Sequence, residues 1–180
     1  MKKNSFKKLI TVTLTIGGLG LATTSSLAAS TSTLDIPVTK NPITNIAKTK
    51  GISILKTWVQ DNTDPTTKAP IADRLQIKLS NTTKSRISNL EIFYTMIDTV
   101  TKASESYYKK LIGFDLPAKT IKFIYFDNTK GPGHFSENQY SLYRHSNNEV
   151  TFKIEISAKG FAPQYARAIK AKGTTENPNG

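Results

Sequence analysis

The sequence predicts an all-β protein: an antiparallel immunoglobulin-like or jelly-roll-like β-sandwich of about seven to eight strands. Three observations lead to this fold class. Apolar residues recur at every second position in several segments, which is the period of a strand with one buried face. Turn-forming residues separate these segments at intervals of about 10 to 15 residues. No segment shows the apolar spacing of a helix long enough to connect parallel strands, which favours antiparallel sheets.

The predicted strands differ in how regular their alternation is. Alternation is clearest at residues 150–156, where Thr151, Lys153 and Glu155 are interleaved with apolar residues. Residues 121–126 are apolar at nearly every position, which predicts either a central strand covered on both faces or a strand whose second face is a binding surface. The run 121–126 belongs to a predicted strand over 120–126. The other predicted strands are residues 52–59, which stop at a turn over 61–65, and residues 75–79, 90–98, 107–112 and 165–170.

The first 29 residues are predicted to be a secretory signal peptide. A lysine-rich start precedes an apolar stretch over residues 9–22, and small residues follow it up to Ala28 and Ala29. This stretch of about 14 residues is shorter than the roughly 20 that a spanning helix needs, so a cleaved signal is favoured over a membrane anchor. No later segment is apolar enough to span a bilayer. We therefore expect an exported protein, periplasmic or extracellular, with an extended arm at 30–50, the β-sandwich domain at 51–172 and a disordered tail at 173–180.

Composition limits both the compartment and the partners. The chain has no cysteine, so its core must hold it together in an oxidising compartment without disulfides. The formal charge of +12 falls to about +8 without the four lysines of the predicted signal peptide, and is still basic. The lysines are scattered and lack the interleaved aromatics of a base-stacking surface, which argues against nucleic acid as a partner. In an exported protein, such a charge suits anionic envelope polymers, acidic glycans or solubility.

A local resemblance lies in residues 81–95. A strand ends at Asn81 and Thr82, a short polar turn follows, and Leu90, Ile92 and Tyr94 alternate in the next strand. This stretch resembles the equivalent part of cellulose-binding modules of the family 3 type, which are secreted bacterial β-sandwiches. The resemblance covers about 20 residues and implies a jelly-roll-like sandwich and, by analogy of fold, carbohydrate binding. The ligand face and calcium ligands of that family are not matched to positions in this sequence.

The candidate site lies in residues 127–148, a non-periodic connection between two predicted strands. Connections of this length in compact domains are usually functional or disordered, and the aromatic residues here favour order. The candidate binding residues are Asp127, His134, Phe135, Tyr140, Tyr143 and His145. Elsewhere, Trp58 and the tyrosines at 94, 107, 108 and 125 have rings suited to stacking on sugars. Core packing is favoured for each of them singly, while together they keep glycan binding open.

These residues predict a non-catalytic binding or accessory module that recognises a glycan or a protein at the cell envelope or outside the cell. No catalytic residue, metal ligand or cofactor is predicted, because the spacing of His134 and His145 fits no zinc site and no Gly-x-Ser-x-Gly elbow occurs. Two alternatives stay open. One is a small secreted hydrolase or metal-dependent enzyme that uses His134 and His145. The other is an assembly subunit that pairs through edge strands, with residues 31–50 as donor. The oligomeric state is open.

Overall fold

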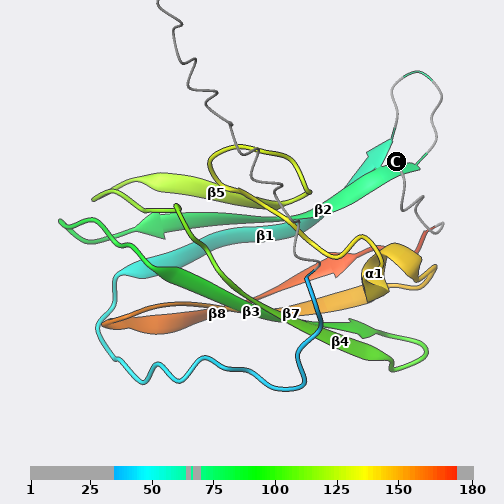
Figure 1. The fold of residues 1–180 in the computed structure, drawn as a ribbon, viewed down its shortest axis with the longest axis horizontal. Helices are drawn as coiled ribbons and strands as arrows, with labels where there is room; N and C mark the ends of the chain where they lie inside the picture. Colours follow the sequence, from blue (N-terminus) through cyan, green and yellow to red (C-terminus); the bar gives the residue numbers. More distant parts are fainter. Residues whose placement is uncertain (1–34, 64–65, 67–69, 174–180) are drawn as a thin grey trace, which may run out of the picture. The chain divides into compact units, whose positions relative to one another are not determined.

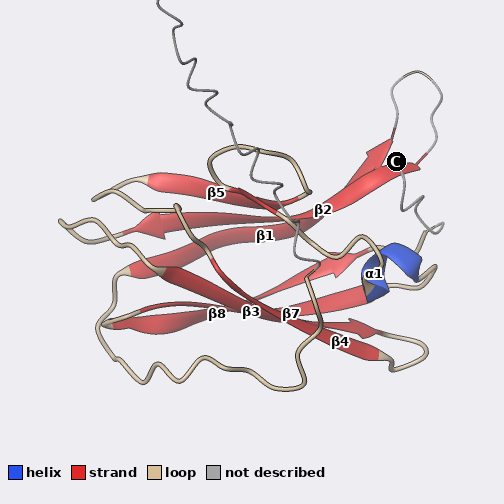
Figure 2. Cartoon of the chain, viewed as in Figure 1, coloured by secondary structure: helices blue, strands red, loops and turns tan. Residues whose placement is uncertain are grey.

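The protein consists of two four-stranded sheets, seen in a computed structural model that describes residues 35–63, 66 and 70–173 (Figures 1 and 2). The strands in this part of the chain are β1 (Ile52–Thr63), β2 (Pro70–Asn81), β3 (Leu90–Asp98), β4 (Ser104–Lys110), β5 (Ile121–Phe126), β6 (His134–Phe135), β7 (Val150–Ala158) and β8 (Phe161–Lys170), and one short helix, α1 (Leu142–His145), precedes β7. The first sheet has the order β1-β2-β5-β6, and the second has the order β4-β3-β7-β8. Neighbouring strands are antiparallel, except that β6 runs parallel to β5. The all-β sandwich predicted from the sequence is confirmed.

A single hydrophobic core lies between the inner faces of the two sheets. In β3, buried and half-buried residues alternate along the whole strand, as a period of two requires. The ring of Tyr94 in β3 contacts the ring of Phe126 in β5, with centroids 5.6 Å apart, so side chains of the two sheets interlock. Burial of apolar surface therefore holds the sheets together, as a chain without cysteine demands. The fully buried core side chains include Leu75, Ile77, Leu79, Ile92, Met96, Ile124, Phe126, Val150, Phe152 and Ile156.

Several strands differ from their predicted limits. β2 is longer than the predicted 75–79, β4 spans Ser104–Lys110 rather than 107–112, and β7 continues past 156 to Ala158. The turn predicted to begin at Asp61 is wrong at its start, because β1 continues to Thr63 and pairs there with Pro70 of β2. The end of β1 is polar and has no alternating apolar residues, so its pairing with the backbone of β2 is what keeps it in the sheet. β8 begins at Phe161 rather than at 165, because a two-residue turn with Gly160 at φ +86° joins it to β7. β8 lies at the edge of its sheet, where a proline such as Pro163 is tolerated.

The part of the predicted arm that the structure describes, residues 35–50, crosses the second sheet without forming a strand or helix (Figure 1). Val38 N donates to Ser106 O of β4 at 2.8 Å, and Ala162 N of β8 donates to Thr49 O at 2.7 Å. Because β4 and β8 are the two edges of this sheet, the segment passes from one edge to the other. Midway, Asn45 Nδ2 donates to Ser157 Oγ, Ala158 O and Phe161 O at 2.8 to 2.9 Å.

The connection over residues 127–148 contains β6 and α1, and it ends where β7 begins. In the part of the chain described, no helix is long and apolar enough to cross a membrane. The predicted signal peptide at 1–29 and the predicted tail, apart from Gly173, lie outside the described residues and stay predictions.

Candidate functional site

The outer face of the first sheet carries a row of four aromatic rings. Alternation in β5 turns Ile124 and Phe126 into the core and Phe123 and Tyr125 outward. This explains why residues 121–126 are apolar at nearly every position: the strand has a core face and a second apolar face. The outer face is open at β5, where Phe123 is 38% exposed. Together with Trp58 of β1 and His134 of β6, these outward rings form what we call the aromatic row: Trp58, Phe123, Tyr125 and His134.

The four rings of the aromatic row contact one another in sequence. Trp58 meets Phe123 edge to face, with centroids 6.4 Å apart. Phe123 and Tyr125 are 6.0 Å apart with their planes at 10°, and Tyr125 and His134 are 4.7 Å apart with their planes at 22°. The row therefore runs from β1 across β2 and β5 to β6. Its rings come from β1, β5 and β6, and β2 lies between β1 and β5 in the sheet.

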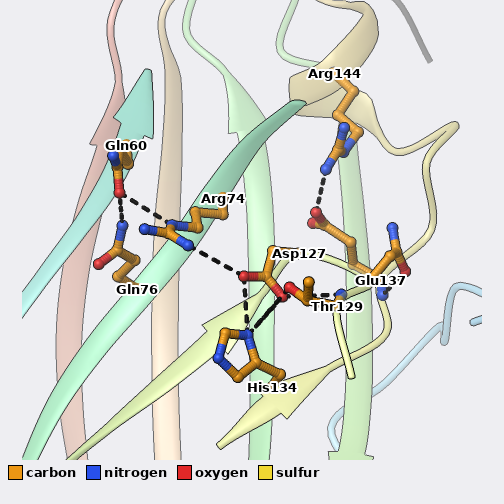
Figure 3. Close-up of polar contacts among 9 residues, drawn as sticks. Gln60, Arg74, Gln76, Asp127, Thr129, His134, Glu137 and Arg144 are labelled. Atoms are coloured by element: carbon orange, nitrogen blue, oxygen red, sulfur yellow. Dashed lines mark hydrogen bonds and ion pairs between the residues drawn. The ribbon is translucent and has the colours of Figure 1, made fainter. Parts of the chain in front are cut away.

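Polar residues of β2 and β1 lie beneath and beside the rings. Gln76 pairs in register with Trp58 on one side and Tyr125 on the other, and it is only 4% exposed. Its amide donates to Gln60 Oε1, which also accepts a hydrogen bond from Arg74 Nε at 3.0 Å (Figure 3). A buried side-chain amide needs such a partner, because leaving it unpaired costs about 1 to 3 kcal/mol. The hydrogen bond to Gln60 therefore fixes the Gln76 side chain, which lies between Trp58 and Tyr125 in the sheet.

Three cationic side chains lie over the aromatic row. Lys56 Nζ is 4.9 Å from the ring centroid of Trp58, and Lys78 Nζ is 5.5 Å from that of Phe123. The guanidinium of Arg74 lies 5.1 Å from the ring centroid of Tyr125. These are cation–π distances, and each such contact contributes about 0.5 to 1 kcal/mol at an exposed site. The outer face is therefore both aromatic and positively charged.

Asp127 anchors the β6 end of the row. Its carboxylate accepts from His134 Nδ1 at 3.0 Å and from Arg74 Nη1 at 3.3 Å (Figure 3). Partial burial acts to raise the pKa of Asp127, but hydrogen bonds from Thr129 and His134 outweigh it and hold the pKa below the usual aspartate value. An ionised carboxylate only accepts, so Nδ1 of His134 carries the proton. Asp127 thus fixes the plane in which the imidazole stacks on Tyr125.

Gly133 brings β6 close enough to complete the row. Its φ is +84°, and a Cβ at this position would lie 2.7 Å from Phe123 O. Because Gly133 O accepts from Tyr125 N at 2.8 Å, the two backbones must approach this closely for β6 to pair with β5. A glycine is therefore required directly before His134.

The contacts of His134 differ from those of a catalytic histidine. Thr129 Oγ1 lies 3.2 Å from Nδ1, the same nitrogen that donates to Asp127. A nucleophile–histidine–acid relay needs the hydroxyl and the carboxylate on opposite ring nitrogens. Among the residues described, no group of three or more His, Cys, Asp or Glu is placed to hold a metal ion. The arrangement orients an imidazole ring and builds no relay.

The six residues predicted as a site fall into three places. Asp127 and His134 lie at the end of the aromatic row. Phe135, the neighbour of His134, points inward, with its ring 6.0 Å from that of Phe126. Tyr143 is 1% exposed and donates to Glu137 Oε2 at 2.6 Å inside the molecule. Tyr140 is 57% exposed and stacks on His145 at 6.0 Å, in a separate pair beside α1.

The buried cluster around Glu137 fastens the 127–148 connection to the core. Glu137 forms an ion pair with Arg144, and both side chains are only 2% exposed (Figure 3). Burial raises the pKa of Glu137 to about 7, although Arg144 and Tyr143 stabilise its charged form. Glu137 N also donates to Asn128 Oδ1 at 2.9 Å, which ties the cluster to the turn after β5. The connection that carries His134 to the first sheet is therefore held from inside.

Sequence reasoning found three of the four rings of the aromatic row, including His134 as a candidate binding residue, but did not bring them together. Trp58 and Tyr125 were recognised as possible sugar-stacking residues, and the second apolar face of residues 121–126 was noted. Phe123 was not singled out, nor were the cations Lys56, Arg74 and Lys78. The signal in the sequence is that the residues facing away from the core in β1, β2 and β5 include aromatic or cationic side chains. This signal identifies one surface only once the order of the strands in the sheet is known. Comparison with known proteins finds no family model and no curated protein that matches this chain.

Proposed function

We propose that the chain is a non-catalytic binding module that holds a glycan polymer on the aromatic row, at the cell envelope or outside the cell. The observation that carries this proposal is the row itself, four contacting rings on a solvent-facing sheet. The C–H face of a sugar ring packs on aromatic surface, while its hydroxyls bond to polar groups at the ring edges. Contiguous apolar patches on a protein surface usually mark a place of binding.

The layout of the row favours an extended ligand over a small one. The rings are spread across the sheet face from β1 to β6 rather than gathered in a deep cavity. The polar groups that accompany them, Gln60, Arg74 and Asp127, are fixed by bonds to one another. A preorganised surface of this kind loses little side-chain entropy on binding. A polymer that lies along the sheet would contact several rings at once.

A pull-down tests the proposal. The protein is mixed with insoluble cellulose, chitin, peptidoglycan and cross-linked polygalacturonate beads, and the retained fraction is measured. Trp58→Ala and Tyr125→Ala are each expected to weaken retention about tenfold, since central aromatic anchors contribute most of the binding energy at such surfaces. The matched control is Tyr165→Ala, which removes a 71% exposed tyrosine from the second sheet. Absence of retention on every polymer, or equal losses in all three variants, would contradict the proposal.

The hydrolase alternative makes a different prediction. His145 stacks on Tyr140 and donates from Nδ1 to Ser141 O at 3.2 Å, outside the aromatic row. Under the binding proposal, His145→Ala therefore leaves retention unchanged. Release of soluble sugars by the wild-type protein that disappears in His145→Ala would favour the enzyme instead.

A further inference from the structure

We propose that the polymer held by the aromatic row is an acidic polysaccharide, bound through carboxylate or sulfate groups at Lys56 and Lys78. This inference rests on the proposed function and names the class of glycan. Both lysines lie over rings of the row, so a ligand stacked on those rings has its substituents within reach of two ammonium groups.

The first observation is the pairing of the two lysines. Lys56 of β1 and Lys78 of β2 are direct cross-strand partners on the same outer face. Like charges directly opposite each other in an antiparallel pair are destabilising. Such a pair is explained when an anion lies between the two groups and converts repulsion into two attractions. Lys56 is exposed and Lys78 is half-buried, so an incoming anion can reach both.

The second observation is that neither lysine has an acidic partner among the side chains described. Among the side chains that the structure describes, Asp127 is the acid in contact with the row, and its carboxylate is already engaged by Arg74 and His134. No ion pair involves Lys56 or Lys78 within the same set of residues. The β1 and β2 end of the row therefore has an uncompensated positive charge. Complementarity requires negative charge on the ligand.

The position of the charges favours a polysaccharide as the anion's carrier. An acidic sugar has its carboxylate or sulfate on the edge of the ring whose flat side stacks, so the rings and the ammonium groups are engaged together. The ammonium groups of Lys56 and Lys78 lie over the faces of Trp58 and Phe123, so a sugar that stacks there displaces them from the rings onto its own anionic groups. Single-stranded nucleic acid combines stacking and charge as well, so it is included in the test as a competing ligand.

The test compares matched polymers. Polygalacturonate beads are compared with the same beads after methyl esterification, and dextran sulfate with dextran. Wild-type protein is expected to bind the acidic member of at least one pair about tenfold more tightly, with affinity falling as salt is added. Lys56→Gln with Lys78→Gln should lose about tenfold in affinity for that polymer, given up to about 1 kcal/mol for each exposed charge pair.

The matched control is Lys84→Gln with Lys153→Gln. These two lysines are exposed, lie away from the aromatic row and make no described ion pair, and the double variant has the same net charge as the test variant. Its affinity is expected to change less than about twofold. An equal loss in the two double variants would show a nonspecific charge effect and would overturn the inference.

The remaining outcomes separate this inference from the function on which it rests. If the protein binds the acidic and the neutral polymer of both pairs equally, and Trp58→Ala still loses this binding, the ligand is a glycan without a need for acidic groups. That result would overturn the inference and leave the proposed glycan binding in place. Tighter binding of a 20-nucleotide single-stranded DNA than of any polysaccharide would overturn both. Absence of binding to every polymer would overturn the proposed function and the inference with it.

Discussion

The outer faces of the two sheets differ in what lies on them. The second sheet is crossed by residues 35–50, which are hydrogen-bonded to β4 at one edge and to β8 at the other. The first sheet carries the aromatic row, and Phe123 and Ile121 of β5 are 38% and 51% exposed there. The chain lays its own segment across the second sheet (Figure 1), although Tyr165 and Ile169 of β8 are still 71% and 53% exposed there. On the first sheet, the rings of the aromatic row and the cations over them form the outer face.

This difference identifies the surface that has a use outside the fold. Apolar residues on the inner faces are explained by the core they build together. The rings on the outer face of the first sheet stabilise no second layer, and their cost in exposed apolar surface needs another explanation. Binding supplies one. The following predictions compare substitutions on the inner and outer faces of the sheets, and on the outer faces of the first and second sheets, by their effects on stability and on polymer binding.

The largest effect is expected in β5, where two phenylalanines of one strand lie on opposite faces. Phe126 is 1% exposed, so Phe126→Ala should lower the free energy of unfolding by about 3 to 5 kcal/mol. Phe123→Ala should lower it by less than about 1.5 kcal/mol and should weaken polymer binding instead. Urea unfolding followed by circular dichroism measures the first quantity. Similar losses of stability in the two variants would show that the outer ring is structural.

The next effect concerns the support of the aromatic row by the buried Glu137. Because the pKa of Glu137 in the folded state, about 7, lies above its usual value, protonation favours folding. The stabilisation is complete below the usual glutamate pKa of about 4.5 and is lost as the pH rises through 7. The shift corresponds to about 3 kcal/mol over that range. Unfolding free energies measured from pH 5 to pH 9 should fall in the wild type, whereas Glu137→Gln should flatten this decline; a decline of unchanged size in the variant would assign it to another group.

A smaller loss is expected where residues 35–50 cross the second sheet. Asn45→Ala removes three hydrogen bonds, two to β7 and one to β8, and should cost about 2 kcal/mol of stability. Asn41→Ala is the control, since Asn41 makes the same local bond to the backbone two residues on but only one bond across the sheet, to Glu155. Thermal unfolding should separate the two variants. Equal melting temperatures would mean that the crossing segment does not depend on Asn45.

The smallest difference is expected between two glycines with similar backbone angles. Gly133 and Gly160 have φ of +84° and +86°, but only at Gly133 does an added Cβ meet another atom within 4 Å. Gly133→Ala should therefore cost about 1 kcal/mol more than Gly160→Ala, and only Gly133→Ala should weaken polymer binding, because it displaces His134 from Tyr125. Equal binding by both variants would show that β6 is not needed for the aromatic row.

The sequence predicted the fold better than the site. Alternation in β3 and β7 is a local property of the chain, so both strands and their inner faces were predictable. The aromatic row depends on strand order, because Trp58, Phe123 and His134 become neighbours only when β1, β2, β5 and β6 form one sheet. The 127–148 connection was recognised as ordered, but which of its aromatics enter the core was not predictable. Tyr143 and Tyr140 have the same residue type, and only the packing of α1 buries one and exposes the other.

The most direct measurement uses the single tryptophan of the chain, because Trp58 is itself part of the aromatic row. Its fluorescence is recorded while polygalacturonate or dextran sulfate is added to the wild-type protein. Ligand stacking on the row predicts a change in emission that saturates at the concentration where binding saturates, and that Tyr165→Ala leaves intact. Saturable polymer binding with no change in Trp58 emission would place the ligand elsewhere and contradict the assignment of this face.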